Sequence, residues 1–316
     1  MEIITTSILI PSFNTRELSV QCIRAIEKNP PASAYEIILM DNNSSDGTAD
    51  DVSRLFPHVR VMRNQQNLGV GKACNRAVQE AQGKYLLLLN NDVQLLPGSI
   101  EALVQWLERH PKTGIVGPEL VDANGMLIQM SWGWIPVLHG EIIQRFFAPK
   151  GLQKSDLRKR LVRYLQRHSR RVPWLCCACA LIRREAFDEV GGFDEDFALY
   201  FEDSDLCQRC DQRGWHNDFV PEIKAIHLLS QAARPDFNEF SLIYLQSHIA
   251  YYRKHAPFWG VWLLKGYLLF KWAMLAVKNR TRLKEPSQAK AYCSKFLQVV
   301  LEKQRISLPR GAESSC

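Results

Sequence analysis

The chain has 316 residues, of which 46% are hydrophobic and 23% charged, so it is long and apolar enough for one large domain or two smaller ones and is not a disordered protein. Its net charge of +7 is compatible with an anionic partner, but no feature indicates nucleic acid and no nucleic-acid partner is expected. The amino-terminal stretch MEIITTSILIPSFN lacks the basic start and cleavage site of a secretory signal. We therefore expect a cytoplasmic protein with reduced cysteines.

The first half of the chain alternates apolar, strand-like runs with amphipathic stretches. Strands are predicted in SILIPSFN (7–14), YEIILMD (35–41), HVRVMRN (58–64) and KYLLLL (84–89), and a helix over residues 70–82. This order predicts an α/β fold with a mostly parallel central sheet flanked by helices on both faces.

Polar residues follow three of these strands at once. They are Asn14, Asp41 and the triplet Asn90, Asn91 and Asp92. Ligands of parallel sheets bind beyond the carboxyl ends of the strands, so we expect the three groups to converge on one crevice.

Residues 145–171 contain ten Lys or Arg and one Asp, and they separate the first half from a second apolar block. This segment is either a solvated loop and helix or a basic surface that faces phosphates or anionic lipid.

A long apolar stretch lies near the carboxyl terminus, at residues 258–277, but Lys265 and Lys271 fall inside it. Its Leu, Val and Phe side chains favour insertion by about 3–5 kcal/mol, and each central lysine costs about 3 kcal/mol, so we do not expect it to span a bilayer. A helix lying in the membrane interface, anchored by Trp259, Trp262 and Trp272, is the expectation. The alternative is a helix pair packed on the protein's own core.

Two C-x-x-C pairs, Cys176 with Cys179 and Cys207 with Cys210, superficially resemble a zinc site. However, WLCCACALI is predicted as a strand, in which positions three apart face opposite sides. In DLCQRCDQRG, predicted as a helix, the cysteines fall on the apolar side. We expect small buried hydrophobic residues, with structural zinc as the alternative.

Five motifs follow one another in a definite order: PSFN (11–14), DNNSSDGT (41–48), NLGVGKACNRA (67–77), NND (90–92) and FEDSDLCQR (201–209), and His227 comes after them in IHL. In order and spacing they resemble the family-2 glycosyltransferases, which bind nucleotide sugars on the glycosyltransferase-A fold. The resemblance covers residues 5 to about 230.

The resemblance implies a division of the chain. A catalytic domain would span residues 1–240, with a nucleotide-sugar-binding half at 1–125, the basic insert at 145–171 and an acceptor half at 172–240. A C-terminal amphipathic helical region would follow at 241–316. The nucleotide-sugar-binding residues would be Pro11, Phe13, Asn14, Asp41, Asn43, Asn67, Gly69, Lys72, Asn90 and Asn91.

The resemblance also implies a metal-dependent, inverting transfer. Asp92 and His227 would hold a divalent metal, Mn²⁺ or Mg²⁺, which neutralises the charge that develops on the leaving diphosphate. The Glu202–Asp203 pair would be catalytic, with Asp203 as the base that takes the proton from the acceptor hydroxyl and Asp205 as the next candidate.

Within the family, the segment from residue 177 to 209 is most similar to bacterial rhamnosyltransferases that build cell-surface polysaccharides such as lipopolysaccharide. The implied donor is dTDP-rhamnose, and the implied acceptor is a saccharide or lipid-linked saccharide reached by peripheral contact with the inner face of the plasma membrane. A UDP- or GDP-hexose donor is the alternative within the family. Two other classes stay open: an inactive, membrane-associated nucleotide-binding protein, and, because GVGKAC mimics a dinucleotide fingerprint, an NAD-dependent oxidoreductase.

The sequence departs from the family pattern in three respects. Asn90 and Asn91 replace carboxylates, the glycine that often follows the histidine is missing after His227, and Cys177 stands where a small glycine is usual. The first departure leaves Asp92 as the one anionic ligand of the triplet.

Overall fold

The computed structural model describes residues 4–125, 131–133, 135, 164, 167–228, 239–282, 286–303 and 305–308. The strands are β1 (Thr6–Ser12), β2 (Tyr35–Asp41), β3 (Arg60–Arg63), β4 (Tyr85–Leu89), β5 (Val93–Leu95), β6 (Thr113–Val121), β7 (Trp132–Gly133), β8 (Arg170–Arg171), β9 (Trp174–Leu175), β10 (Cys179–Arg183) and β11 (His216–His227). The helices are α1 (Arg16–Lys28), α2 (Thr48–Leu55), α3 (Gly69–Glu80), α4 (Ser99–Arg109), α8 (Arg184–Glu189), α9 (Glu202–Gln212), α10 (Glu239–His255), α11 (Phe258–Arg282) and α12 (Pro286–Val300). Most of the basic segment 145–171 lies outside the described residues.

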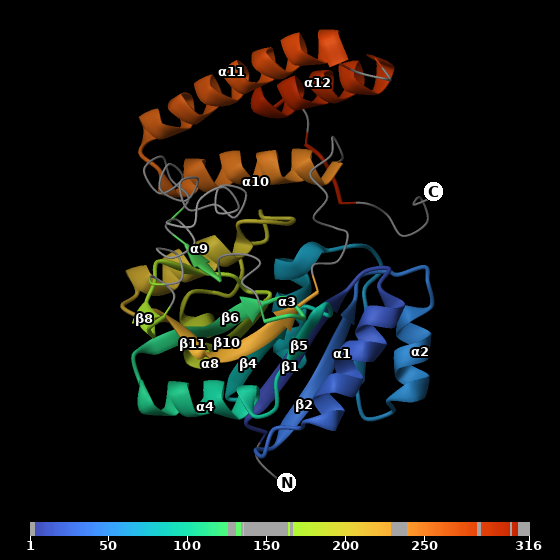
Figure 1. Ribbon diagram of the computed structural model, residues 1–316, viewed down its shortest axis with the longest axis vertical. Helices are drawn as coiled ribbons and strands as arrows, with labels where there is room; N and C mark the ends of the chain where they lie inside the picture. Colours follow the sequence, from blue (N-terminus) through green and yellow to red (C-terminus); the bar gives the residue numbers. More distant parts are fainter. Residues whose placement is uncertain are drawn as a thin grey trace.

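One sheet of nine strands forms the centre of the molecule (Figure 1). Its order is β3-β2-β1-β4-β10-β6-β11-β5, with β8 beside β11. The first four strands run parallel, and β6 is parallel to β11, whereas β10, β5 and β8 pair antiparallel with their neighbours. The predicted α/β fold is thus confirmed, but the sheet is mixed rather than mostly parallel, because four of the eight strand pairings among the described residues are antiparallel.

The run of four leucines in β4 is buried on both faces of this sheet. Leu87 and Leu89 belong to the core on one side, with residues of α1, α2 and α4, while Leu86 and Leu88 belong to the core on the other, with residues of α3 and α9. Successive strand residues point to opposite faces, so a strand covered on both sides needs apolar residues at every position.

The prediction of one strand over WLCCACALI is wrong in its middle. β9 ends at Leu175 and β10 begins at Cys179, and a turn at residues 177–178 separates them. The apolar pattern alone does not reveal the break, because Cys177 and Ala178 are buried in the turn as they would be in a strand. As predicted, Cys179, Cys207 and Cys210 are buried, whereas Cys176 is only partly buried, and the cysteines of the described residues carry free thiols.

The three C-terminal helices share a third core that reaches the α/β unit. α10, α11 and α12 pack their apolar faces together, and Phe197 and Phe201, from the segment before α9, insert into the same cluster. In Figure 1 these helices lie above the central sheet and its flanking helices. None of the described helices is long and apolar enough to cross a membrane.

The α11 helix packs one face on the neighbouring helices, as the alternative for the 258–277 stretch expected, and leaves another face exposed. Leu264 and Leu268 are buried against the neighbouring helices, whereas Trp262 on the outer side is 71% exposed. Trp272, which we predicted as an interface anchor, instead lies against α12 and donates its indole N–H to Cys293 O at 2.9 Å. The structure therefore removes Trp272 from the predicted anchors and leaves Trp259 and Trp262 exposed.

Candidate active site

The first polar group fastens the ends of β1 and β2 together. Ser12 and Asp41 lie opposite each other in the parallel ladder. Asn14, in the left-handed region with φ 51°, accepts the N–H of Ser45 at 2.8 Å and donates its own N–H to Ser44 Oγ at 2.9 Å. The side chain of Asn14 thus organises the DNNSSDGT turn, in addition to the donor contact that the resemblance implies.

Asp41 has the free acceptor that a nucleobase would need. Its Oδ2 accepts the N–H of Ser44 at 3.2 Å, while Oδ1 is buried and has no hydrogen-bond partner among the described residues. A buried oxygen without a partner is costly unless a ligand supplies the donor. The geometry therefore fits a ring N–H at this point. Asn43 follows in a left-handed conformation and is exposed.

A chain of buried amides, which sequence reasoning missed, joins this turn to α3. Arg76 donates to Asn64 Oδ1 at 2.6 Å, Asn64 donates to Asn42 Oδ1 at 2.9 Å, and Asn42 donates to Gly69 O at 3.1 Å. Asn42 and Asn64 are 4% and 5% exposed. An Asn directly after each of two neighbouring strands was the available signal, since buried amides must be paired.

The start of α3 is tightly enclosed by segments from much later in the chain. Asn67 accepts the N–H of Gly69, whose φ is +76° and where a Cβ would meet Ala198 O at 1.9 Å and Leu308 Cδ1 at 3.2 Å. Lys72 Nζ pairs with Glu195 at 3.0 Å. The segment before α9 and the C-terminal tail therefore both border the loop that the resemblance assigns to the donor.

The two asparagines of the polar triplet after β4 contact different segments of the chain. Asn90 donates its N–H to Ala178 O at 2.8 Å, and Asn91 donates its amide to Thr15 Oγ1 at 2.6 Å. Asn91 Nδ2 also contacts Ser19 Oγ at 3.0 Å. The resemblance implied a donor contact for both asparagines; the structure shows Asn91 joining the triplet to α1 and Asn90 joining it to the turn at residues 177–178.

Asp92 and His227 come together at the other end of the triplet. Their Oδ1 and Nε2 atoms are 3.3 Å apart, and both side chains are about nine-tenths buried. Leu228 donates its N–H to Asp92 O at 2.8 Å, which fixes this register. The pair offers one carboxylate and one imidazole to a metal ion. No group of three or more His, Cys, Asp or Glu side chains in the described part of the chain is arranged to hold an ion.

A sparse site fits the metal that the fold implies. Mg²⁺ typically takes one or two protein carboxylates and fills its remaining positions with waters and substrate phosphates, and Mn²⁺ also accepts imidazole. Asp92 and His227 would supply the protein ligands, and a donor diphosphate would supply the rest.

Glu202 and Asp203 begin α9 as two partly buried neighbouring acids. Burial and the adjacent Asp203 carboxylate raise the pKa of Glu202 to about 8, and its Oε2 has no hydrogen-bond partner among the described residues. Burial also raises the pKa of Asp203. The indole of Trp174, which lies beside it without completing a hydrogen bond, and the N–H groups of Ser204 and Cys177 moderate that rise in pKa.

Asp205 has a different environment, which argues against it as the alternative base. It is fully buried and contacts Arg209 Nε, Lys254 Nζ and His255 Nε2, each at 2.7 Å. Burial alone would raise its pKa, but the hydrogen bonds from His255 and Lys254 outweigh it and hold the pKa below the ordinary value. A carboxylate with three cationic or imidazole partners is a weak base and has no free face for an acceptor. Asp205 is therefore a structural residue.

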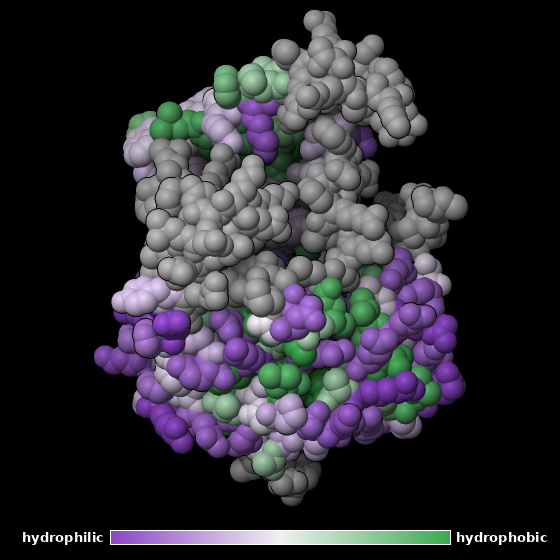
Figure 2. Space-filling model, viewed as in Figure 1, coloured by the Kyte–Doolittle hydropathy of each residue, from purple (hydrophilic) through white to green (hydrophobic). Residues whose placement is uncertain are grey.

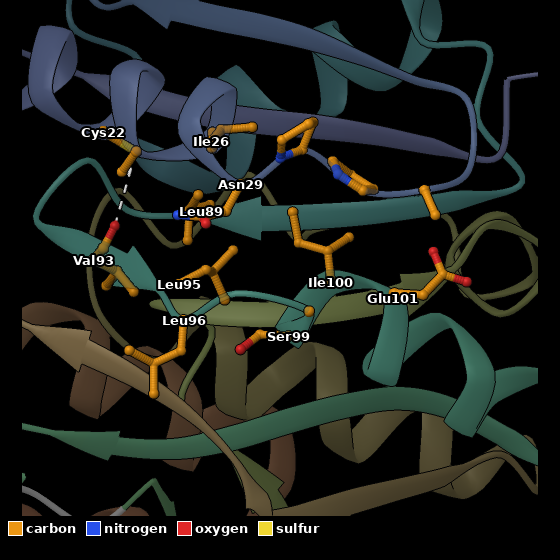
Figure 3. A pocket seen from close by; sticks show the side chains of 15 residues that line it. Cys22, Ile26, Asn29, Leu89, Val93, Leu95, Leu96, Ser99, Ile100 and Glu101 are labelled. Atoms are coloured by element: carbon orange, nitrogen blue, oxygen red, sulfur yellow. Dashed lines mark hydrogen bonds between the residues drawn. The ribbon is translucent and has the colours of Figure 1, made fainter.

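A cavity of about 230 Å³ lies between α1, β5 and α4, behind the triplet (Figure 3). Its lining is mostly apolar, with Ile26, Leu95 and Ile100 pointing into it, and Glu101 is its charged residue. Cys22 closes one side and lies 3.8 Å from Val93 O. A mostly apolar lining with one carboxylate does not suit a diphosphate, so this cavity is not our candidate for the donor site.

The sequence matches the family model described as "Glycosyl transferase family 2" over residues 7–191, more than half of the chain. The chain belongs to this family. A second model, "Glycosyl transferase family group 2", matches residues 150–278. The protein is therefore an enzyme, a glycosyltransferase, as the motif order predicted.

Among characterised relatives, the N-acetylglucosaminyl-diphospho-decaprenol L-rhamnosyltransferase of Mycobacterium tuberculosis is 30% identical over 263 residues. The match covers 78% of this glycosyltransferase and 84% of the relative. The O-antigen biosynthesis protein RfbC of Myxococcus xanthus is 25% identical over 236 residues, covering 73% of this chain and 18% of that protein. The predicted resemblance to rhamnosyltransferases is confirmed.

Solved structures show that the glycosyltransferase-A fold is shared. The mannosyltransferase PcManGT of Pyrobaculum calidifontis, in complex with GDP-Man and Mn²⁺, aligns with a TM-score of 0.57 at 16% identity and covers 95% of this chain and 88% of that chain. GalNAc-T7 with UDP, GalNAc and Mn²⁺ aligns with a TM-score of 0.55 at 17% identity, covering 95% of this glycosyltransferase and 56% of that chain. The predicted fold is confirmed.

Proposed function

We propose that this glycosyltransferase moves L-rhamnose from dTDP-rhamnose to a saccharide carried on a lipid diphosphate, with inversion at the anomeric carbon, in bacterial cell-surface polysaccharide synthesis. The relative from M. tuberculosis is named for such an acceptor and such a sugar, and its match extends over most of both chains. The observation that carries the proposal is the turn at residues 177–178. Ala178 O in this turn accepts the N–H of Asn90, and the N–H of Cys177 points to Asp203. The turn thus joins the proposed donor residues to the proposed base.

Asp203 is the proposed base. Its Oδ1 accepts the N–H of Ser204 at 2.7 Å, which orients the carboxylate. Burial raises the pKa of Asp203, and a carboxylate with a raised pKa takes a proton from a hydroxyl more readily than an exposed one. On the donor side, Asp41 would accept a hydrogen bond from the N–H of the nucleobase, and Asp92 with His227 would hold a divalent metal. When bound, that metal neutralises the charge that develops on the leaving diphosphate.

Transfer assays distinguish the donor classes. Purified enzyme is incubated with dTDP-rhamnose, UDP-N-acetylglucosamine or GDP-mannose, a polyprenyl-diphosphate N-acetylglucosamine acceptor, and Mn²⁺, Mg²⁺ or EDTA. Product formed from dTDP-rhamnose and abolished by EDTA supports the proposal. Transfer from a UDP- or GDP-sugar assigns the alternative donor. Nucleotide binding without any transfer would identify an inactive binding protein, and NADH binding an oxidoreductase.

The proposed location is peripheral, on the inner face of the plasma membrane, with α11 as the contact. The outer side of α11 exposes a row of large apolar side chains: Phe258, Trp259, Trp262, Leu263, Tyr267, Phe270 and Met274. Figure 2 shows hydrophobic residues along the upper edge of the molecule, over α11. The helix sequence contains five Lys or Arg and no Asp or Glu. Aromatic residues combined with positive charge are the composition of helices that lie in anionic membrane interfaces.

Vesicle flotation tests this contact. Wild-type protein is expected to float with vesicles containing phosphatidylglycerol and to be partly released by 0.5 M salt. The triple variant Trp259→Ala, Trp262→Ala, Phe270→Ala is expected to remain in the soluble fraction. Leu55→Ala, at an exposed leucine of α2, is the matched control and should float as wild type does. Equal flotation of the triple variant and the wild type contradicts the proposed contact.

A further inference from the structure

Two consecutive aromatic residues immediately before the acidic pair adopt an unfavourable backbone conformation. Tyr200 has φ 66° and Phe201 has φ 68°, which lies in the left-handed region that bulky residues rarely adopt. Phe201 is the N-cap of α9 and accepts the N–H of Asp205 at 2.9 Å. The direction in which Glu202 and Asp203 leave this turn therefore depends on the conformation of Phe201. Such a conformation persists only when its surroundings hold it in place.

The contacts that hold this turn come from one face of α10. His248 stacks on the ring of Phe201, with centroids 5.0 Å apart and planes at 9°, and Tyr244 and Tyr251 lie 5.1 and 5.4 Å from the same ring. Tyr244 also meets Tyr200 edge to face at 5.5 Å. The α10 residues recur at helical spacing, so they form one stripe facing the turn.

Polar contacts from the same stripe extend along both sides of the turn. Ser247 Oγ donates to Leu199 O at 2.7 Å, just before the two aromatic residues. Tyr251 Oη donates to Gln208 Oε1, and His255 contacts Asp205, so the first two turns of α9 are tied to α10 as well. Phe201 is 7% exposed as a result. In Figure 1, α10 lies directly above the segment that leads into α9.

We infer that α10 is a positioning element of the active site, in which His248 holds the left-handed turn at Phe201 and thereby sets the position of Asp203 relative to the acceptor hydroxyl. This inference rests on the proposed role of Asp203 as base. It assigns to the C-terminal helices a part in the transfer step itself, separate from the membrane contact on the opposite side of α11. None of these α10 residues is a catalytic residue, because they act through the turn.

The inference predicts that a substitution at His248 slows the transfer step and leaves donor binding unchanged. The residues that face the donor belong to β1, β2, α3 and the triplet, none of which contacts His248 in the interactions described. His248→Ala is therefore expected to lower kcat about 10- to 100-fold, the effect of a small misplacement of a reacting group, with the donor KM within about twofold of wild type. His248→Phe keeps a flat ring against Phe201 and is expected to restore kcat.

Hydrogen exchange provides a readout that does not depend on activity. The amide of Asp205, bonded to Phe201 O, is expected to exchange faster in His248→Ala than in wild type and to be protected again in His248→Phe. Trp272→Phe is the matched control, because it removes a hydrogen bond within the same helical unit at the α11–α12 contact. It should change neither kcat nor exchange in residues 199–205. If His248→Ala is poorly folded, Ser247→Ala tests the same turn through Leu199.

The outcomes are distinguishable. Lower kcat with unchanged donor KM, faster exchange at residues 199–205 and recovery in His248→Phe support the inference. Wild-type kcat and exchange in His248→Ala overturn it, as does an equal loss of kcat in Trp272→Phe. If wild-type enzyme transfers no sugar, or if Asp203→Asn transfers normally, the proposed function fails, and the exchange data alone then decide whether α10 holds the turn.

Discussion

His227 Nε2 lies 3.3 Å from Asp92 Oδ1, although the two residues come from opposite halves of the chain. The antiparallel pairing of β11 with β5, in which His227 is opposite Val93, brings them together. Without that short edge pairing, no imidazole would lie beside the Asp92 carboxylate. With it, the Asp92 carboxylate and the His227 imidazole lie side by side just after the end of β4.

Replacing Asp92 by alanine is expected to reduce metal-dependent transfer more than a hundredfold, because charge neutralisation at a leaving diphosphate contributes several kcal/mol to the transition state. His227→Ala should have a smaller effect, seen mainly as a higher metal concentration for half-maximal rate, because the carboxylate remains. Initial rates across a Mn²⁺ titration measure both effects. Asp50→Asn, at an exposed acid of α2, is the control. A wild-type metal response in Asp92→Ala would exclude this site.

Asp203→Asn is expected to lower kcat by about 10²- to 10⁴-fold, the usual contribution of a general base. Donor binding should persist, because the donor contacts lie on other elements, and the nucleotide-induced rise in Tm measures it. Asp205→Asn is the informative comparison. It weakens a buried cluster with Arg209, Lys254 and His255, so its main expected effect is a free energy of unfolding lower by several kcal/mol. Near-normal turnover in Asp203→Asn would show that another group is the base.

Glu202 makes stability depend on pH in a definite direction. Burial and the Asp203 charge raise its pKa to about 8 in the folded protein, while the unfolded chain releases the proton near 4.5. Between these values the native state holds a proton that the unfolded state has lost. The stabilising contribution is therefore complete below about pH 4.5 and is lost as pH rises through 8.

Comparison with Glu202→Gln isolates this contribution, since the amide cannot titrate. Thermal unfolding from pH 4.5 to 9 should show wild-type Tm falling relative to that of the variant as pH rises. Glu195→Gln, at a partly exposed acid paired with Lys72, serves as the control with no such trend in the same direction, because its pKa is lowered by that partner. Parallel Tm curves for wild type and Glu202→Gln would contradict a proton held on Glu202.

Gly69→Ala and Gly47→Ala separate backbone strain from steric exclusion. Both glycines have positive φ, at +76° and +81°, so each alanine costs about 1 kcal/mol from the backbone alone. At Gly47 the added Cβ meets nothing within 4 Å, whereas at Gly69 it would meet Ala198 O at 1.9 Å. Gly69→Ala should therefore be several-fold more destabilising in chemical denaturation and should also weaken nucleotide binding. Equal unfolding free energies for the two variants would contradict this close approach.

The local elements were largely predictable from the sequence, because their signals are short-range. The leucines of β4 indicated a strand covered on both faces, and the polar residues after β1, β2 and β4 indicated a crevice at the strand ends. The helix predicted over DLCQRCDQRG is also found, since α9 includes residues 205–212 of that stretch. In each case the period of the apolar residues or a change from apolar to polar residues is sufficient.

Long-range contacts determined what the same side chains do. Asp203 and Asp205 are two residues apart and chemically equivalent in the sequence, yet Asp205 is surrounded by Arg209, Lys254 and His255, which leaves Asp203 as the candidate base. The sequence likewise predicted one strand across the turn at residues 177–178, because burial requires the same small apolar residues in either conformation.

The sequence by itself therefore determined the family, the first four strands and the candidate residues for the chemistry, since periodicity and motif spacing are local properties of the chain. Only the tertiary structure decided that Asp205 is paired with Arg209, Lys254 and His255, that Asn91 contacts α1, and that α10 packs on the turn at Phe201. Those outcomes depend on the electrostatic and packing environment that distant segments create when they fold together, and no local pattern of residues contains that environment.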